Sequence, residues 1–506
     1  MLRSIGSNWS LNALQIAVFM VLTPFISNAV GNDAYGAWEI IVAWTGILQL
    51  LSLGLPMATV RALSAAVARK DAPAATKALG TSLSLTLVLG IVAAVLGTGV
   101  YLYFTQSVMQ GWSTASAELR SDAALALVIM LANVALSFAL KLPYAVFDAH
   151  QDFLVRNVVM AAGFASKLGA SIVLLSWRSD LTTLAAVQVG IASFEFLAAM
   201  LVSKRRHPLV RFRPTAIDPV EAKGLLSFSV FAFLLNMGAM LAFRIDAIVI
   251  GDFLETADAA IYGYGNKIFD PFIGILLAIG MVLMPMAASE SSRGNTERIR
   301  DEFLKWSKIA TTIVMLMGGY LVVLGPQFLE AWLGDVYRPA SGRVLQILMA
   351  SFFFFLPVRG VALPVLMGLG RPKVPGFGLL AMGLTNLSLS LILVRPYGIM
   401  GVALGTAIPN VLFSLLFLRE ACKRLDLSIG EWLSYTLGRL LPATALCAGA
   451  LAFVSSQVHI AGYPMVIGAG VAYTALFAVF AIGFIYHGDR FLNTAPLRAR
   501  LRAKLP

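Results

Sequence analysis

Apolar segments long enough to cross a lipid bilayer recur along almost the whole chain. A membrane-spanning helix needs about 20 apolar residues to cross roughly 30 Å of hydrocarbon. Charged residues make up only 13% of the sequence, against roughly 25% in soluble domains, so the chain requires lipid as its solvent. We therefore predict an all-α integral membrane protein of about 14 transmembrane helices, and not a soluble enzyme. The predicted spans are residues 9–30, 37–60, 79–104, 122–147, 154–177, 181–203, 226–251, 260–288, 309–331, 343–368, 374–394, 398–419, 438–456 and 463–486.

Basic loops and loops poor in basic residues alternate along this set of helices. Residues 31–36 contain no lysine or arginine, and residues 252–260 carry only acidic charges. Basic loops face the cytoplasm under the positive-inside rule, which places both termini there. The net charge of +12 therefore indicates contact with anionic lipid headgroups and no nucleic acid. The basic loops follow the second, sixth, eighth, tenth and twelfth spans, and include Arg69, Lys70, Lys77, Lys204, Arg205, Arg206, Arg211, Arg213, Lys223, Arg293, Arg298, Arg300, Lys305, Lys308, Arg371, Lys373, Arg419, Lys423 and Arg424.

Cysteine and histidine do not form a metal or redox pattern in this sequence. The two cysteines, Cys422 and Cys447, fall in different predicted segments, so no disulfide framework is expected. The four histidines are scattered in loops or near predicted helix ends and lack the spacing of metal ligands. We predict no cofactor and no metal. The histidines are His150, His207, His459 and His487.

The sequence resembles itself at a distance of about 220 residues. Leu142-Pro143 near the end of the fourth span corresponds to Leu363-Pro364 in the tenth, and Tyr35-Gly36 corresponds to Tyr262-Gly263. Repeated halves build many transporters, whose substrate site lies between them near the middle of the membrane. We predict an N-terminal six-helix bundle (residues 1–207), a basic cytoplasmic linker (208–225), a second six-helix bundle (226–424), two added helices (425–488) and a basic cytoplasmic tail (489–506).

Charged side chains occur inside several predicted spans. Each costs about 2.5–3.5 kcal/mol at the centre of a membrane helix, so it is expected to face water, a partner or a substrate. The bases suggest a cavity that binds an anionic headgroup, since arginine offers a planar fork of donors that matches phosphate. We predict substrate binding by Arg61, Lys141, Lys167, Arg244, Lys267 and Arg359, and ion coupling or gating by Glu39, Glu195, Asp246 and Asp270.

The seventh and eighth spans carry two charged pairs at one depth. Arg244 and Asp246 precede the outer end of one helix, and Lys267 and Asp270 follow the outer start of the next. One residue of each pair is expected to turn toward the other helix, forming either a structural ion-pair latch or part of a charged pocket. Both roles are compatible if the pairing changes between transport states. Snorkelling, in which a long side chain extends to the membrane interface, accounts for the charges of Arg61 and Lys141. It accounts less well for Lys167 and Arg359. Glu195 is expected within about a turn of Lys167.

Several motifs in their order and spacing resemble polysaccharide flippases of the Wzx type. The first twelve spans carry most of the resemblance. These flippases belong to the multidrug/oligosaccharidyl-lipid/polysaccharide exporter superfamily. The matching stretches are Thr23-Pro24-Phe25, Tyr35-Gly36-Ala37-Trp38, Leu53-Gly54-Leu55, Ala58-Thr59-Val60-Arg61, Asp246-Ala247-Ile248-Val249-Ile250-Gly251, Ala260-Ile261-Tyr262, Gly368-Leu369-Gly370-Arg371-Pro372-Lys373, Asn386, and Tyr397-Gly398-Ile399-Met400-Gly401-Val402-Ala403-Leu404-Gly405-Thr406.

The resemblance implies two six-helix bundles around a V-shaped central cavity with a cationic lumen. It implies alternating access in a bacterial cytoplasmic (inner) membrane and export of a polyprenyl-diphosphate-linked oligosaccharide from the inner to the outer leaflet. Such a protein serves lipopolysaccharide O-antigen or exopolysaccharide synthesis, with the polymerase machinery as a possible partner. Only Arg61 and Asp246 fall in matching motifs. The other site residues are predicted from charge and depth alone.

Three other functions remain open at this point. A peptidoglycan lipid II flippase also has fourteen helices, but its usual arginine-aspartate signature near the first helix is replaced here by Asn8, Asn12 and Gln15. A drug/cation antiporter of the same superfamily typically has twelve helices and acids in its first half, where Glu39 and Glu195 are the acids well inside helices. A scaffold of a polysaccharide synthase has no need of mid-membrane bases.

The charge of the expected substrate bears on how its export is driven. A diphosphate carries about two negative charges, and moving each outward gains about 2.3 kcal/mol per 100 mV of inside-negative potential. The membrane potential can therefore drive export or reset an empty basic carrier. Coupling to a proton or sodium gradient is a further hypothesis, with Asp246, Asp270 and Glu39 as candidates.

Overall fold

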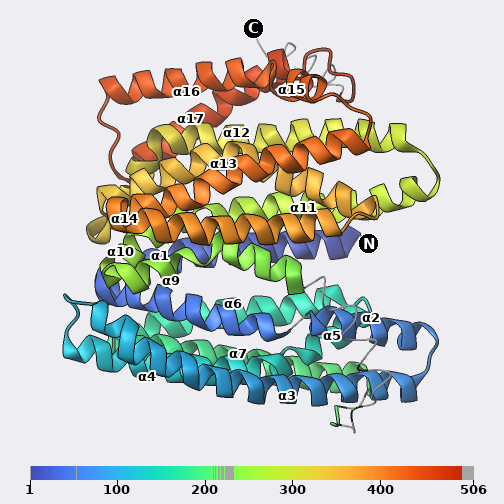
Figure 1. The fold of residues 1–506 in the computed structure, drawn as a ribbon, viewed down its shortest axis with the longest axis vertical. Coiled ribbons are helices and arrows are strands. Elements are labelled where there is room, and N and C mark those ends of the chain that lie inside the picture. The colour runs from blue at the N-terminus through green and yellow to red at the C-terminus, as the bar shows by residue number, and fades with distance from the viewer. Residues whose placement is uncertain are drawn as a thin grey trace. The chain divides into compact units, whose positions relative to one another are not determined.

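The computed structural model describes residues 2–52, 54–208, 210, 212–214, 217, 222 and 233–492, with the side chains of residues 2–6, 8 and 9 excluded. Most of the predicted linker (208–225) and of the basic tail (489–506) lies outside the described residues. The described part of the chain is helical throughout its regular structure, with no strand (Figure 1). The predicted all-α class is therefore confirmed.

The described residues contain eleven helical stretches long and apolar enough to cross a membrane, and a twelfth if the bent pair Phe233–Phe243 and Asp246–Phe253 forms one span. Two stretches have double length. Helix α1 (Leu2–Gln49) is interrupted at Gly31, with φ +81°, and α14 (Lys373–Arg424) at Gly398, with φ +56°. The 52 residues of α14 would measure about 78 Å if straight, well over twice the hydrocarbon thickness. Division at these glycines yields the fourteen predicted spans.

Some predicted boundaries differ from the observed ones. The expected outer loop at residues 31–36 shrinks to a turn at Gly31, a position whose left-handed backbone favours glycine. Lys308, which the sequence places among the basic loop residues, lies inside α12 (Thr296–Leu333) and is only 4% exposed. The very short turn between Trp177 and Leu181 is present as predicted, because α6 ends and α7 begins at these two residues.

The chain divides into two compact units. Unit 1 comprises residues 1–240 and 247–260, and unit 2 comprises residues 241–246 and 261–506. Unit 1 contains α1, α2 (Leu55–Ala68), α3 (Ala72–Tyr103), α4 (Ala117–Leu140), α5 (Leu142–Ala149), α6 (Phe153–Trp177) and α7 (Leu181–Arg206). Unit 2 contains α11 (Phe269–Ser292), α12, α13 (Pro339–Gly368), α14, α15 (Ile429–Leu437), α16 (Leu440–Gln457) and α17 (Gly462–Phe480). The unit boundaries fall within the helical piece Phe233–Phe243, α9 (Asp246–Phe253) and α10 (Thr256–Lys267).

Side chains cap the N-termini of three helices in unit 1. Asp71, Ser116 and Asp180 accept hydrogen bonds from backbone N–H groups in the first turns of α3, α4 and α7. Such caps satisfy donors that have no partner inside the helix. Small residues then let these helices approach closely: a Cβ atom at Gly90 of α3 would lie 2.5 Å from the carbonyl oxygen of Ala135 in α4. Close approach at small residues is typical of helix packing in membranes.

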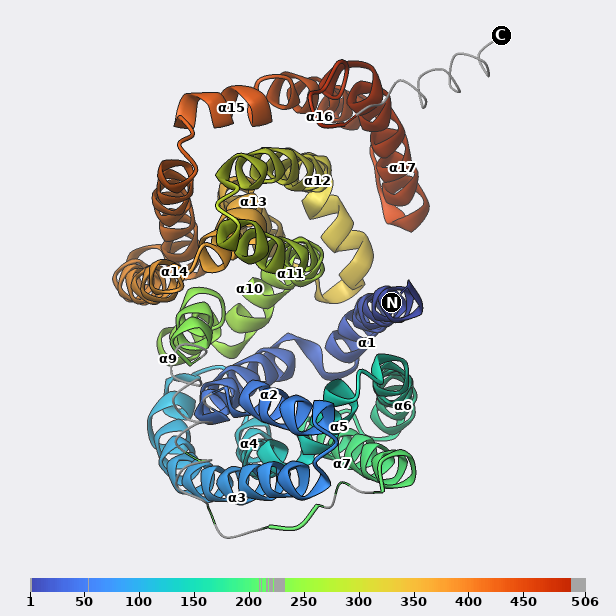
Figure 2. The ribbon, with the colours of Figure 1, turned by 90° about the vertical axis from the view of Figure 1, so that its right-hand side faces the viewer.

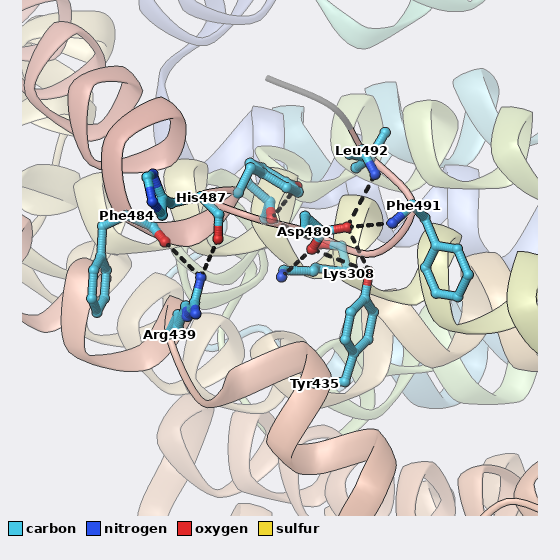
Figure 3. A network of polar contacts seen from close by, with 10 residues as sticks. Lys308, Tyr435, Arg439, Phe484, His487, Asp489, Phe491 and Leu492 are labelled. Atoms are coloured by element: carbon cyan, nitrogen blue, oxygen red, sulfur yellow. Dashed lines mark hydrogen bonds and ion pairs between the residues drawn. The ribbon is translucent and has the colours of Figure 1, made fainter. Parts of the chain in front are cut away.

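The last helices of the chain pack against α12 within unit 2. Helices α16 and α17 run beside α12 (Figure 2), and Tyr320 of α12 donates to the carbonyl oxygen of Val466 at 2.9 Å. Figure 3 shows a polar network around Lys308 of α12, in which Lys308 and Asp489 form an ion pair of 2.6 Å. Tyr435 of α15 donates to Asp489 at 3.1 Å. Three segments distant in sequence are thus joined by one buried carboxylate.

Candidate functional site

The structure brings seven of the ten predicted site residues into three clusters. A first cluster in unit 1 holds Lys141, Lys167 and Glu195. Two clusters in unit 2 surround Asp270 and Asp246. Of the other three predicted residues, Glu39 lies in α1, Arg61 in α2 and Lys267 at the end of α10.

The unit 1 cluster contains a glutamate between two lysines. Tyr144 of α5 donates to Glu195 of α7 at 3.2 Å, and the charges of Lys167 and Lys141 both act on the Glu195 carboxylate. A Cβ at Gly163 would lie 2.0 Å from the carboxylate oxygen, so Glu195 rests against the backbone of α6. The expected proximity of Glu195 and Lys167 is present. The sequence did not predict the contact of Tyr144 with Glu195, because a tyrosine near a helix end does not by itself indicate a binding role.

A break in the seventh span organises both clusters of unit 2. Its two helical pieces meet at an angle of 48°, with Arg244 and Ile245 between them. Carbonyl groups before a break lose their partners within the helix. Asn386 of α14 donates its amide to two of these carbonyls, at 2.9 Å to Ala242 and 3.3 Å to Leu241. The break is therefore stabilised by a neighbouring helix. Arg244 lies within the break, and Asp246 is the first residue of the helical piece that follows it.

The cluster around Asp270 contains two arginines and one aspartate. Arg244 forms an ion pair of 3.5 Å with Asp270, as expected for the two neighbouring spans. The Arg359 guanidinium lies 4.3 Å from the ring centre of Phe243 and interacts electrostatically with Asp270. One terminal nitrogen of Arg359 is buried and has no hydrogen-bond partner among the described residues. Such an orphaned donor is costly, and guanidinium groups form strong hydrogen bonds with oxyanions.

The cluster around Asp246 is built from neutral donors. Asp246 is only 2% exposed. Its carboxylate accepts from Tyr262 at 2.5 Å, from Thr406 at 2.9 Å and from Asn386 at 3.5 Å. Within the described part of the chain, no lysine, arginine or histidine pairs with Asp246. A buried carboxylate without a cationic partner is expensive in a membrane.

The arrangement around Asp246 also offers oxygen ligands beyond the carboxylate. The side-chain oxygen of Asn386 accepts from Ser390 at 2.9 Å and from Thr406 at 3.4 Å. Carboxylate, amide and hydroxyl oxygens are hard ligands suited to a small cation. Sequence reasoning singled out Asp246 but not Tyr262, Asn386 and Thr406 as its partners. The sequence signal that could have indicated Asn386 and Thr406 is their polarity inside the otherwise apolar eleventh and twelfth spans.

Comparison with known proteins assigns the family. Residues 1–290, more than half of the chain, match the family described as Polysaccharide biosynthesis protein. The chain belongs to this family. A Putative O-antigen transporter of Shigella flexneri is 19% identical over 413 residues, which cover 81% of this chain and 96% of that relative. The Uncharacterized membrane protein EpsK of Bacillus subtilis (strain 168) is 22% identical over 502 residues, 94% of each chain.

Solved structures show the same fold. The lipid II flippase MurJ in an inward closed conformation matches with a TM-score of 0.69 at 14% identity, over 96% of this chain and all of that one. A multidrug resistance MATE family transporter in an inward-facing conformation matches with a TM-score of 0.68 at 16% identity, over 82% of this chain and 94% of that one. The predicted resemblance to the exporter superfamily is confirmed. The protein is a multi-pass membrane protein of a bacterial transporter family. The O-antigen relative, the lipid II flippase and the MATE protein are all named as transporters or flippases.

Proposed function

We propose that this protein is a flippase that moves a polyprenyl-diphosphate-linked oligosaccharide from the inner to the outer leaflet by alternating access. The observation that carries the proposal is Arg359, whose buried terminal nitrogen has no partner among the described residues. A transporter retains such a costly donor where a substrate supplies the acceptor. The diphosphate is the acceptor proposed here. The site comprises Arg359, Arg244 and Asp270.

Exchange of ion-pair partners gives this site a way to release and bind its substrate. Arg244 pairs with Asp270 at 3.5 Å while both side chains stay about half exposed, at 58% and 48%. An exposed pair of this kind contributes little to stability, so a diphosphate can displace Asp270 at low cost. Two arginines then face about two negative charges. When the substrate leaves, Asp270 again neutralises Arg244, which lowers the cost of resetting the empty carrier.

The remaining predicted residues and the orientation extend this proposal. Lys141, Lys167 and Glu195 form a second basic region in unit 1, and Arg61, Lys267 and Glu39 stay proposed substrate or coupling residues. We place the protein in the cytoplasmic membrane with both termini in the cytoplasm. The substrate is then loaded from the leaflet where it is made, and export of its negative charge is favoured by an inside-negative potential. Membrane lipids and the polysaccharide polymerase machinery are its proposed neighbours.

Flipping in reconstituted vesicles tests the proposal directly. Fluorescent polyprenyl-diphosphate oligosaccharide is placed in one leaflet, and its appearance in the other is followed with and without protein. Parallel vesicles contain fluorescent lipid II or a cationic dye. We expect fast movement of the oligosaccharide lipid only. Movement of lipid II alone would identify a peptidoglycan flippase, and movement of the dye alone would identify a drug antiporter. If none of the three probes moved, the protein would be a non-transporting scaffold. Each of these results contradicts the proposal.

Ion coupling is assigned to Asp246 in the same proposal. The Asp246→Asn side chain keeps nearly the same shape and still accepts from Tyr262 and Thr406, but it neither exchanges a proton nor neutralises a cation. We expect Asp246→Asn to remove the stimulation of flipping by a sodium or pH gradient, with the membrane potential clamped. The exposed Asp335→Asn serves as the matched control and should keep full stimulation. Gradient stimulation that persists in Asp246→Asn would exclude this residue as the coupling site.

A further inference from the structure

A cavity of about 80 Å³ lies inside unit 1, where the second span is broken. Helix α1 ends at Gln49, a 3₁₀ turn covers Leu50–Ser52, and α2 starts at Leu55 after Gly54 with φ +73°. Irregular backbone at membrane depth is tolerated where it is buried in protein or lines a cavity. The cavity is lined on one side of the break by Gln49 and Ser52, and on the other side by Leu55.

The polar lining of the cavity comes from three further segments. Thr86 of α3, Ser137 of α4 and Lys141 complete it, and Lys141 is the charged residue among the lining side chains. The hydroxyls of Thr86 and Ser137 donate to carbonyls one turn back in their own helices, both at 2.8 Å. The side chains of Gln49 and Ser52 have no hydrogen-bond partner in the described part of the chain. The Gln49 amide and the Ser52 hydroxyl are therefore available donors in the lining that also contains Lys141.

The electrostatics of the cavity favour an anion. Its lining contains no carboxylate, and Lys141 is the one basic side chain among the lining residues. The first turn of α2 adds partial positive charge, since it carries no acidic residue and no side-chain cap. The nearest acid that acts on Lys141 is Glu195 of α7, which is not part of the lining. Lys141 is exposed at the surface of the unit, so a ligand can reach it.

The volume limits the ligand to a small group. A cavity of about 150 Å³ holds one benzene molecule. The present cavity of about 80 Å³ therefore has room for a single tetrahedral oxyanion, and not for a sugar ring with its hydroxyls. We propose that this cavity binds one phosphoryl group, held by Lys141, Ser52 and Gln49 at the broken second span. The source of the group is either the diphosphate of the lipid-linked substrate, an assignment that rests on the proposed function, or inorganic phosphate.

Equilibrium dialysis of the purified full-length protein in detergent against radiolabelled inorganic phosphate tests this site. We expect Lys141→Met to weaken one class of phosphate site roughly 10- to 150-fold, the loss typical of a hydrogen bond to a charged group. Methionine keeps the length of the side chain and removes a charge from the membrane, so the fold should persist. Lys141→Arg should restore binding, and the exposed Lys204→Gln should bind as wild type does.

Competition identifies the source of the phosphoryl group. Displacement of phosphate from the Lys141-dependent site by geranyl diphosphate assigns the site to a prenyl diphosphate headgroup, and a lack of displacement assigns it to free phosphate. Phosphate binding that is unchanged in Lys141→Met overturns the assignment, even if the protein flips its lipid. Lys141-dependent phosphate binding in a protein that flips no oligosaccharide lipid leaves this site standing and refutes the proposed function.

Discussion

Arg359→Gln is expected to slow flipping of polyprenyl-diphosphate oligosaccharide about a hundredfold while the protein stays folded. The variant loses the positive charge and the fork of donors that would face the diphosphate, and one charge-assisted hydrogen bond contributes about 1.5–3 kcal/mol. Each 1.36 kcal/mol corresponds to a factor of ten in rate. Initial flipping rates in vesicles of equal protein content provide the measurement.

The stability of this variant separates a binding role from a structural one. Arg359 carries a buried donor without a partner among the described residues, and its contacts there include the Phe243 ring and the charge of Asp270. Glutamine removes the cost of holding a cation in the membrane. We therefore expect the melting temperature in detergent to stay the same or rise. A large fall in melting temperature, with flipping reduced only in proportion to folded protein, would mean that Arg359 is structural.

Two arginine variants complete this experiment. Arg419 is exposed at the end of α14 and outside the cluster, so Arg419→Gln should flip at the wild-type rate. Arg359→Lys keeps the charge but offers a compact ammonium group in place of the planar fork. Its rate should fall between those of Arg359→Gln and wild type. Equal rates for Arg359→Gln and Arg419→Gln in folded protein would remove the diphosphate from this site.

The sequence was sufficient to predict the spans but not all of their connections. Each span must supply its own apolar length, so the fourteen segments are visible one by one. The turns at Gly31 and Gly398 carry no such signal, because a single left-handed glycine reverses the chain without a polar loop. The start of α12 at Thr296 was missed for a related reason. Its first turns are polar and extend beyond the apolar stretch from which the span was predicted.

Some site residues can be predicted from the sequence because they are charged, whereas others are recognised only when the fold brings them together. Arg244 and Asp270 were predictable because a charge at mid-membrane needs a partner at the same depth, and they pair at 3.5 Å. Thr406 was not predictable as a ligand of Asp246. Hydroxyl groups in membrane helices usually bond to their own backbone, as Thr45 and Thr311 do here. Thr406 lies in a matching motif of the twelfth span, but nothing in the sequence names Asp246 as its partner.

Asp489→Asn is expected to lower the stability of the folded protein by about 3–5 kcal/mol, the usual effect of breaking a buried ion pair. The Lys308 and Asp489 side chains are 5% and 0% exposed, and their charged atoms lie 2.6 Å apart. Loss of the carboxylate leaves the Lys308 ammonium against the rings of Tyr435 and Tyr486, at 4.6 and 5.3 Å. Chemical unfolding in detergent, followed by tryptophan fluorescence, measures the change. Arg424→Gln, which breaks a partly exposed pair with Glu420, should cost about 1 kcal/mol or less.

The pH dependence of this difference has a defined sign. Burial raises the pKa of Asp489, but the hydrogen bond and charge of Lys308, together with the Phe491 N–H and the Tyr435 hydroxyl, lower it further than burial raises it. The pKa of Asp489 in the folded protein thus lies below its ordinary value of about 4. The stabilisation is complete above that ordinary value and is lost as the pH falls through the folded pKa. Wild type and Asp489→Asn should therefore differ by a constant amount from pH 7 to about pH 5, and converge below about pH 4.

Replacing both partners tests whether the charge itself causes the loss. In Lys308→Met/Asp489→Asn no charge remains buried, the asparagine oxygen still accepts from the Phe491 and Leu492 N–H groups, and methionine fills the space between the two tyrosines. Replacement of a buried pair by uncharged side chains is often neutral, so the double variant should be more stable than Asp489→Asn by about 2 kcal/mol or more. A double variant as unstable as the sum of the two single variants would show that Asp489 stabilises the protein through the backbone and Tyr435 alone. Recovery of stability in the double variant would show that a single unpaired buried charge causes the loss. The intact ion pair would then offset the cost of burying its two charges while it connects α15 and the C-terminal segment to α12.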